Sequence, residues 1–256
     1  MEWSSVLLIA LLVAGTVAGM GIVLRFAVIK PRIRTLLLDA DGTLLDFDRA
    51  EASALKEAFE TLGYPFSEEI EAAYHIHNLD CWKSLEKGEI TRAQLKPLRF
   101  RKVFEQMGID GDPEAIWPVY EKALGSYGYV FDGVEEACAR LSKKYDLILV
   151  TNGTKSVQNA RLLQSSIPEY LKAIYISEDV GYAKPAAEFF DKIFADHPKM
   201  KRSETMIVGD SLSGDIAGGN NAGIYTCWVN RTGEKRPDNL RIDLEIEDFV
   251  ALEKEL

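Results

Sequence analysis

The chain has 256 residues, of which 47% are apolar and 27% are charged, so it is neither a disordered tail nor a disulfide-stapled mini-protein, and one or two domains with a hydrophobic core are expected. The formal net charge of −10 disfavours a nucleic-acid partner, because the phosphate backbone is itself negative. Cys81, Cys138 and Cys227 lie far apart without metal-ligand spacing, so no structural zinc or disulfide framework is indicated and a reducing compartment is favoured.

The first segment of the chain is apolar. No charged side chain lies between Trp3 and Leu24, and residues 6–24 are long enough to cross a bilayer, which takes about 20 helical residues. Basic residues follow this run and only Glu2 precedes it, which predicts that the chain after the run lies in the cytoplasm. We therefore predict a single-pass transmembrane anchor and basic linker in residues 1–30. The alternatives are a cleaved signal peptide and a misassigned start codon, the latter of which would make the protein cytoplasmic.

From residue 31 onward, short apolar runs alternate with amphipathic stretches. Such runs are typical of strands buried on both faces of a sheet, and five are predicted, at 34–39, 146–151, 173–176, 205–209 and 224–229. Crossover helices are predicted at 154–164, 186–197 and 213–222. This alternation predicts an α/β fold with a doubly wound, Rossmann-like parallel sheet in residues 31–46 and 132–256.

Residues 47–131 interrupt the alternation with helices alone. Helix starts are indicated at Ser67, at the capping box of Thr91, and at Asp112, which precedes a proline. Pro97 falls inside one of these helices and predicts a kink or an interruption. We therefore predict an all-helical cap domain, inserted after the first strand and placed to cover a site at the edge of the sheet.

Polar residues directly follow the predicted strands. The first strand ends in Asp39 and Asp41, which indicate a metal site or an acid/base pair, although an Asp-Gly pair also occurs in simple turns. The other residues of this kind are Gly42, Thr43, Thr151, Asn152, Lys184, Asp210 and Asp215. Because the carboxyl ends of parallel strands meet at one edge of a sheet, we expect these side chains to share one crevice.

The ordered set Asp-x-Asp-Gly-Thr-Leu, Thr, Lys-Pro and Gly-Asp-(x4)-Asp resembles the four motifs of the haloacid dehalogenase superfamily and spans residues 35–229. Within that superfamily, residues 176–185 and 209–230 closely resemble a family of pyrimidine 5′-nucleotidases. One position departs from that family, which commonly has an acidic residue where this chain has Gly42. The same glycine occurs in sugar-phosphate and phosphoglycolate phosphatases.

The resemblance implies a role for each site residue. Asp39 would be the nucleophile that forms an aspartyl-phosphate, and Asp41 the general acid and base. One Mg²⁺ ion would be held by Asp39, the backbone carbonyl of Asp41, and Asp210. Asp215 would orient Lys184 or a metal-bound water. The groups implied to bind the substrate phosphate are the side chains of Thr151, Asn152 and Lys184 and the backbone N–H groups of Gly42 and Thr43.

The residue at position 41 bears on the reaction that the resemblance implies. Dehalogenases of the superfamily lack a carboxylate there, and P-type ATPases have a threonine and a long-lived phosphoenzyme, so Asp41 favours rapid phosphate release. We predict a Mg²⁺-dependent phosphatase of small phosphate monoesters, in the first place a 5′-nucleotidase for pyrimidine nucleoside monophosphates. The alternatives are a sugar-phosphate or phosphoglycolate phosphatase, a phosphomutase, and a catalytically inactive, membrane-anchored interaction module. No feature of the sequence specifies an oligomeric state.

Overall fold

The computed structural model describes residues 32–256. Within this range no helix combines the length and the apolar character needed to cross a membrane. The predicted span, residues 6–24, lies outside the described residues. Within residues 32–256 the fold class is corrected to an α/β sheet with inserted helices and no membrane-spanning helix, and the predicted single-pass membrane localisation, which depended on such a helix, is corrected with it.

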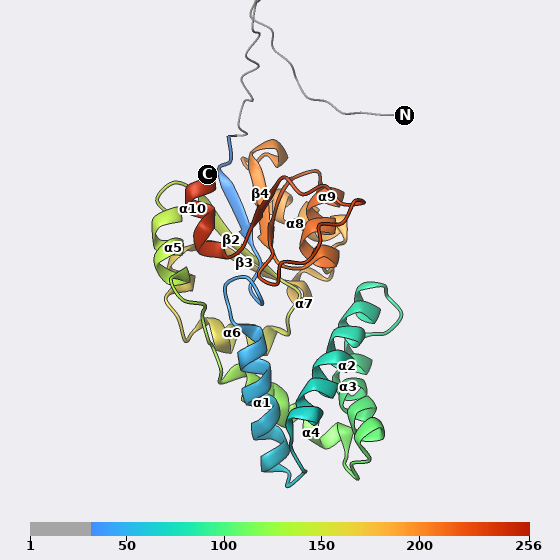
Figure 1. Cartoon of the computed structure of the whole chain (residues 1–256). Coiled ribbons are helices and arrows are strands. Elements are labelled where there is room, and N and C mark those ends of the chain that lie inside the picture. The colour runs from blue at the N-terminus through green and yellow to red at the C-terminus, as the bar shows by residue number, and fades with distance from the viewer. Residues whose placement is uncertain (1–31) are drawn as a thin grey trace, which may run out of the picture. The chain divides into compact units, whose positions relative to one another are not determined.

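Six parallel strands form one sheet in the order β3-β2-β1-β4-β5-β6. Figure 1 labels β2, β3 and β4 of this sheet. The strands are β1 (Thr35–Leu38), β2 (Asp146–Thr151), β3 (Leu171–Ile176), β4 (Thr205–Gly209), β5 (Tyr225–Val229) and β6 (Leu244–Ile246). The five predicted strands are confirmed, with ends shifted by up to a few residues. The short strand β6 was not predicted, because three residues are too few to show a pattern. The strand order reverses between β1 and β4, and ligands of such sheets bind at this position.

Helices cover both faces of the sheet. Successive side chains of a strand point to opposite faces, so the buried strands present apolar side chains to both layers of helices. The helices of this part are α5 (Val134–Leu141), α6 (Lys155–Leu162), α7 (Ser177–Val180), α8 (Ala187–Asp196), α9 (Ala217–Ala222) and α10 (Leu252–Glu255). Leu36 and Leu38 share a core with residues of α5 and α10, whereas Leu37 packs with residues of α8 and α9. The short helical turns are η1 (Ile167–Tyr170), η2 (Arg202–Glu204), the π-helical turn η3 (Leu212–Ile216) and η4 (Phe249–Ala251).

Two expectations for the sheet region are corrected. The prediction that every strand is buried on both faces is wrong for β3, where alternate residues face solvent and Ile174 is 40% exposed. The reason is its place at the edge of the sheet, next to β2 alone. The crossover helix predicted at 213–222 is divided into η3 and α9, whereas those predicted before and after β3 are confirmed in α6 and α8.

Four of the five helices between β1 and β2, those that precede α5, pack on one another around their own apolar core. They are α1 (Phe47–Thr61), α2 (Glu68–Glu86), α3 (Arg92–Met107) and α4 (Pro113–Gly125). The predicted starts at Ser67, Thr91 and Asp112 are confirmed, because each side chain accepts a hydrogen bond from the first turn of its helix. The interruption predicted at Pro97 is absent: α3 runs through this proline, whose ring removes one backbone hydrogen bond close to the start of the helix.

Candidate active site

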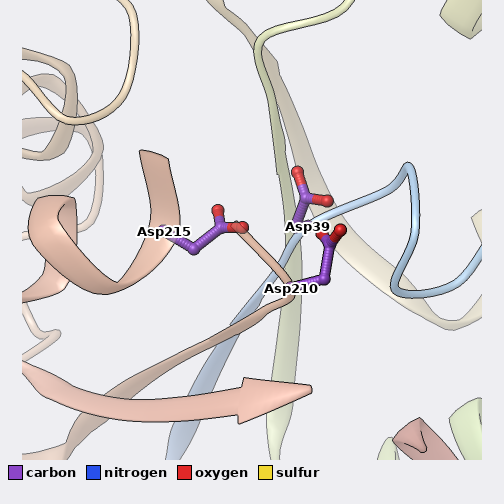
Figure 2. Close-up of side chains that lie close together, drawn as sticks. All are labelled: Asp39, Asp210 and Asp215. Atoms are coloured by element: carbon purple, nitrogen blue, oxygen red, sulfur yellow. The ribbon is translucent and has the colours of Figure 1, made fainter. Parts of the chain in front are cut away.

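Three acidic side chains meet at the carboxyl edge of the sheet. Asp39 follows β1, Asp210 follows β4, and Asp215 lies in η3. Their carboxylates lie close together (Figure 2), with one oxygen of each within 4.8 Å of the others. This is the point at which the strand order reverses, so the fold places the acidic cluster where a ligand of such a sheet would bind.

Lys184 places one positive charge inside this cluster. Its ammonium group donates to Oδ1 of Asp39 at 2.5 Å, to Oδ1 of Asp215 at 2.7 Å and to the carbonyl oxygen of Val150 at 2.8 Å, which uses all three of its donors. The side-chain amide of Asn152 bonds both the N–H and the carbonyl of Lys184. Although burial opposes the charged form, the charges of Asp215 and Asp39 raise the pKa of Lys184. The lysine is therefore a fixed cation.

The cluster still has more negative than positive charge. Burial, and next the charge of Asp215, raise the pKa of Asp39 well above its usual range despite the contact with Lys184. The same two causes raise the pKa of Asp210 to about 7. Three carboxylates beside one ammonium group suit a divalent cation that prefers oxygen ligands, such as Mg²⁺, because its charge would favour the ionised carboxylates.

Gly42 makes room for Asp210. Its φ angle is +81°, and a Cβ atom at this position would lie 2.3 Å from Oδ2 of Asp210, so only glycine fits without strain. The Gly42 N–H, which is predicted to bind phosphate, donates to the carbonyl oxygen of Leu45 at 2.9 Å in the tight turn after β1, so a phosphate oxygen would have to replace or share this bond. Thr43, in the same turn, is buried, and its hydroxyl donates to Oδ1 of Asp210 at 3.4 Å.

Gln158 joins two other predicted site residues. Its Nε2 atom donates to Oδ2 of Asp41 at 2.7 Å and to Oγ1 of Thr151 at 2.8 Å. The hydroxyl of Thr151 also accepts from the backbone N–H of Gly153 at 3.0 Å. Since a hydroxyl has two acceptor positions and one proton, the proton of Thr151 remains available for an oxygen of a ligand.

Two residues that contact Asp41 are not among those predicted from the sequence. Gln158 and Arg161 lie three positions apart in α6, and Arg161 forms an ion pair with Oδ1 of Asp41. Val157 and Leu162 give the same helix a buried apolar side. A glutamine and an arginine in such a helix are typical of an ordinary solvated face, and the only signal was their short distance after the Thr-Asn-Gly motif.

The inserted helices contact this edge of the sheet through Arg92, the first residue of α3. Its Nη2 atom donates to the carbonyl oxygen of Asn152 and to the hydroxyl of Ser177, both at 2.9 Å. Its Nε atom lies 3.5 Å from a carboxylate oxygen of Glu178. Arg92 thus links the inserted helices to the loop after β2 and to α7, which follows β3.

A small cavity beside Asp41 is lined by the inserted helices and by α6. The side chains that face it from the inserted helices include Trp82, Arg99 and Glu121, and those from α6 include Gln158 and Arg161. Its free space is about 30 Å³, which is room for one or two water molecules. A larger ligand therefore requires the inserted helices to shift.

Comparisons with known proteins agree on one family. The model of the haloacid dehalogenase-like hydrolases matches residues 33–223. The HAD-hydrolase YfnB of Bacillus subtilis (strain 168) is 37% identical over 199 residues, which cover 78% of this chain and 85% of YfnB. The pyrimidine 5′-nucleotidase PynA of Streptococcus pneumoniae is 36% identical over 196 residues, covering 76% of this chain and 83% of PynA. The pyrimidine 5′-nucleotidase YjjG of Escherichia coli (strain K12) is 28% identical over 219 residues, covering 86% of this chain and 96% of YjjG.

The fold agrees with these sequence comparisons. A crystal structure of YfnB bound to magnesium matches with a TM-score of 0.84 and 35% identity, over 88% of this chain and 99% of that chain. The family match includes all four motifs, from Asp39 to Asp215. The chain therefore belongs to the haloacid dehalogenase-like hydrolases, and within them it is a phosphoric monoester hydrolase.

Proposed function

We propose that the chain is a Mg²⁺-dependent 5′-nucleotidase that hydrolyses pyrimidine nucleoside monophosphates through an aspartyl-phosphate. The observation that carries this proposal is the contact of Lys184 with Asp39 at the end of β1, which pairs a buried carboxylate with a fixed cation. The names of PynA and YjjG support the substrate class. Residues 47–131 would act as the cap domain over a core of residues 31–46 and 132–256.

In the first step, an oxygen of Asp39 forms a bond to phosphorus while the bond from phosphorus to the ester oxygen breaks. A phosphate dianion repels a carboxylate, so Lys184 and the hydroxyl proton of Thr151 would bind its oxygens and offset their charge. Asp39, the backbone carbonyl of Asp41, and Asp210 would hold a Mg²⁺ ion, which would supply further positive charge. Asp41 would donate a proton to the departing oxygen.

In the second step, a water oxygen forms a bond to phosphorus while the bond from Asp39 to phosphorus breaks. Asp41 would accept a proton from this water, and inorganic phosphate leaves. Asp215 would keep Lys184 in place throughout, through their 2.7 Å hydrogen bond. Two displacements with a carboxylate as intermediate carrier thus replace one difficult hydrolysis.

The lining of the cavity beside Asp41 supports a leaving group with a flat ring. Trp82 offers an aromatic face, and the guanidinium of Arg92 lies 5.4 Å from its ring centroid. Arg99 and Glu121 line the same cavity, where Arg99 is hydrogen-bonded to Asn78 and Glu121 is paired with Lys96. An aromatic face with polar groups at its margin suits a base that stacks and forms hydrogen bonds at its edge.

The test is phosphate release by the full-length protein with Mg²⁺ or EDTA. The substrates are dUMP, dTMP and UMP, beside sugar phosphates and phosphoglycolate. We expect selective, Mg²⁺-dependent turnover of the nucleotides that is lost in Asp39→Asn. Asp191→Asn, which changes a surface ion pair with Arg202, is the matched control and should retain activity.

Other outcomes would favour the alternatives. A preference for sugar phosphates or phosphoglycolate would show that Gly42 is the better guide to the substrate than the similarity to PynA. Absence of turnover with every ester, from a folded protein that binds Mg²⁺, would contradict the proposal and favour a phosphomutase or an inactive interaction module.

A further inference from the structure

Arg161 is a fully buried cation that contacts three parts of the active-site region. Its residue surface is 0% exposed, and its Nη1 atom pairs with Oδ1 of Asp41. Its Nε atom donates to the carbonyl oxygen of Tyr127 at 3.1 Å, and its guanidinium carbon lies 5.6 Å from the ring centroid of Phe47. Phe47 begins α1 and Tyr127 follows α4, so Arg161 lies where the chain enters and leaves the inserted helices.

The fold alone does not explain this arginine. An ionised side chain is costly to bury unless it is paired and hydrogen-bonded. Within residues 32–256, Asp41 is the acid with which Arg161 forms an ion pair, and the Nη2 atom is buried without a hydrogen-bond partner. A methionine or leucine would fill a buried position in α6 without leaving a donor unpaired. The ion pair with Asp41 is therefore the contact that offsets the charge of this buried arginine.

Gln158 holds the other oxygen of the same carboxylate. It is 1% exposed and connects Oδ2 of Asp41 to the hydroxyl of Thr151. The preceding loop is shaped for it, because a Cβ atom on Gly153 would lie 2.4 Å from its Nε2 atom. Both oxygens of Asp41 are thus fixed by donors from one helix, and one of these donors also fixes Thr151.

We infer that Gln158 and Arg161 are positioning residues that fix the orientation of the Asp41 carboxylate beside Thr151, and that aspartyl-phosphate hydrolysis depends on this orientation. The inference rests on the proposed two-step reaction. Neither residue is assigned a bond to the reacting atoms. Their effect on the rate would pass through Asp41, which must present one oxygen to the attacking water while the other remains held.

The two steps differ in their need for Asp41 when the leaving group is p-nitrophenolate. This group departs as a stable anion, so bond formation from Asp39 to phosphorus needs no proton from Asp41. Hydrolysis of the aspartyl-phosphate still requires Asp41 to accept a proton from water. A misplaced Asp41 should therefore slow only the second step with p-nitrophenyl phosphate, but both steps with UMP, whose alkoxide is a poor leaving group.

The test compares Arg161→Met, Arg161→Lys and Gln158→Met with the wild type in rapid-quench kinetics with Mg²⁺. With p-nitrophenyl phosphate, Arg161→Met should release one equivalent of p-nitrophenolate in a burst, followed by a steady state slower than wild type on the order of 100-fold, the loss known for small misplacements of reacting groups. Intact-protein mass spectrometry after acid quench should find most of the enzyme phosphorylated. With UMP the rate should fall without a burst.

Arg161→Lys should restore part of the rate, because it keeps a donor beside Asp41, and Gln158→Met should give a weaker burst. Arg140→Met, which removes a surface pair with Glu253, is the matched control and should match wild type. Equal loss with both substrates and no trapped phosphoenzyme in either folded variant would overturn the inference, as would wild-type kinetics. A wild-type enzyme inactive with both esters would instead overturn the proposed function.

Discussion

The ammonium nitrogen of Lys184 lies 2.5 Å from Oδ1 of Asp39, the carboxylate at the end of β1. The two other donors of this lysine are bound by Asp215 and by the carbonyl oxygen of Val150. An ammonium group has only three donors. A phosphoryl oxygen can therefore reach Lys184 only by replacing or sharing one of these acceptors, and Asp39 is the acceptor that leaves when it becomes bonded to phosphorus.

Lys184→Met should abolish activity and lower the melting temperature. Removing one partner of a buried ion pair costs about 3–5 kcal/mol, because the remaining charge is left unpaired. The decrease in melting temperature should be smaller at pH 5 than at pH 8, since protonation of the acidic cluster relieves the repulsion among its carboxylates. Thermal unfolding in EDTA at both pH values measures this.

The double variant Lys184→Met/Asp215→Asn should be more stable than Lys184→Met alone, because it removes one of the unpaired charges. Lys192→Met, which changes an exposed pair with Asp196, serves as the control and should change little. Equal melting temperatures for Lys184→Met and wild type at pH 8 would contradict the ion-pair argument.

Asp210→Asn should stabilise the metal-free protein above neutral pH. Burial and the charge of Asp215 raise the pKa of Asp210 from 3.8 to about 7, so the folded state binds this proton more tightly than the unfolded state does. In EDTA the stability contributed by the proton is complete below pH 3.8 and is lost as the pH rises through about 7. The asparagine variant should lack that loss, and melting curves between pH 4 and pH 8 test it.

With Mg²⁺ present, wild type should be more stable than Asp210→Asn, the reverse of the order expected in EDTA. A cation that binds only the folded state raises the melting temperature, and we expect this increase in wild type but not in Asp210→Asn. Asp191→Asn should respond to Mg²⁺ as wild type does. An equal Mg²⁺ effect in Asp210→Asn would show that the cation binds elsewhere.

Gly42→Ala should disturb the acidic cluster more than its backbone angle alone explains. Gly63→Ala is the matched control, because Gly63 also has a positive φ angle, +70°, but an added Cβ would meet nothing within 4 Å. Both variants should lose stability through the left-handed backbone, by about 1–2 kcal/mol. Gly42→Ala alone should also lose the Mg²⁺-dependent rise in melting temperature and most of the activity, because the new methyl group displaces Asp210. Identical behaviour of the two variants would contradict this.

The motif order was sufficient to predict which strands meet at the site. Asp39, Lys184 and Asp215 are far apart in the chain, yet each follows a strand of the same parallel sheet or the loop after it, and the carboxyl ends of such strands coincide. Capping residues such as Thr91 predicted helix starts because the hydrogen bonds of a helix cap join residues that are close in the sequence. What could be predicted is therefore what depends on sequence neighbours or on strand order.

The contacts that depend on three-dimensional packing could not be predicted. Nothing local to α6 distinguishes Arg161, which is buried against Asp41, from an arginine on a solvated face. The hydrogen bond from the Gly42 N–H to the carbonyl oxygen of Leu45 was not predicted either, because it depends on how the turn after β1 closes and not on the motif. The helix interruption predicted at Pro97 is absent for a similar reason, since the packing of α3 in the apolar core of the inserted helices compensates for one missing hydrogen bond.

Arg92→Ala should weaken substrate binding while leaving the chemical steps nearly intact. Arg92 contacts the carbonyl oxygen of Asn152 and the hydroxyl of Ser177 from the inserted helices, so its loss removes hydrogen bonds that hold these helices near Asp41. Loss of about 1.4 kcal/mol from such contacts corresponds to a tenfold change in affinity, and we expect KM for UMP to rise about tenfold with kcat little changed. Hydrogen exchange should increase at the start of α3. Arg101→Ala, which removes an exposed pair with Glu114 in the same helices, should change neither quantity; a fall in kcat with constant KM in Arg92→Ala would instead place this arginine in the chemistry.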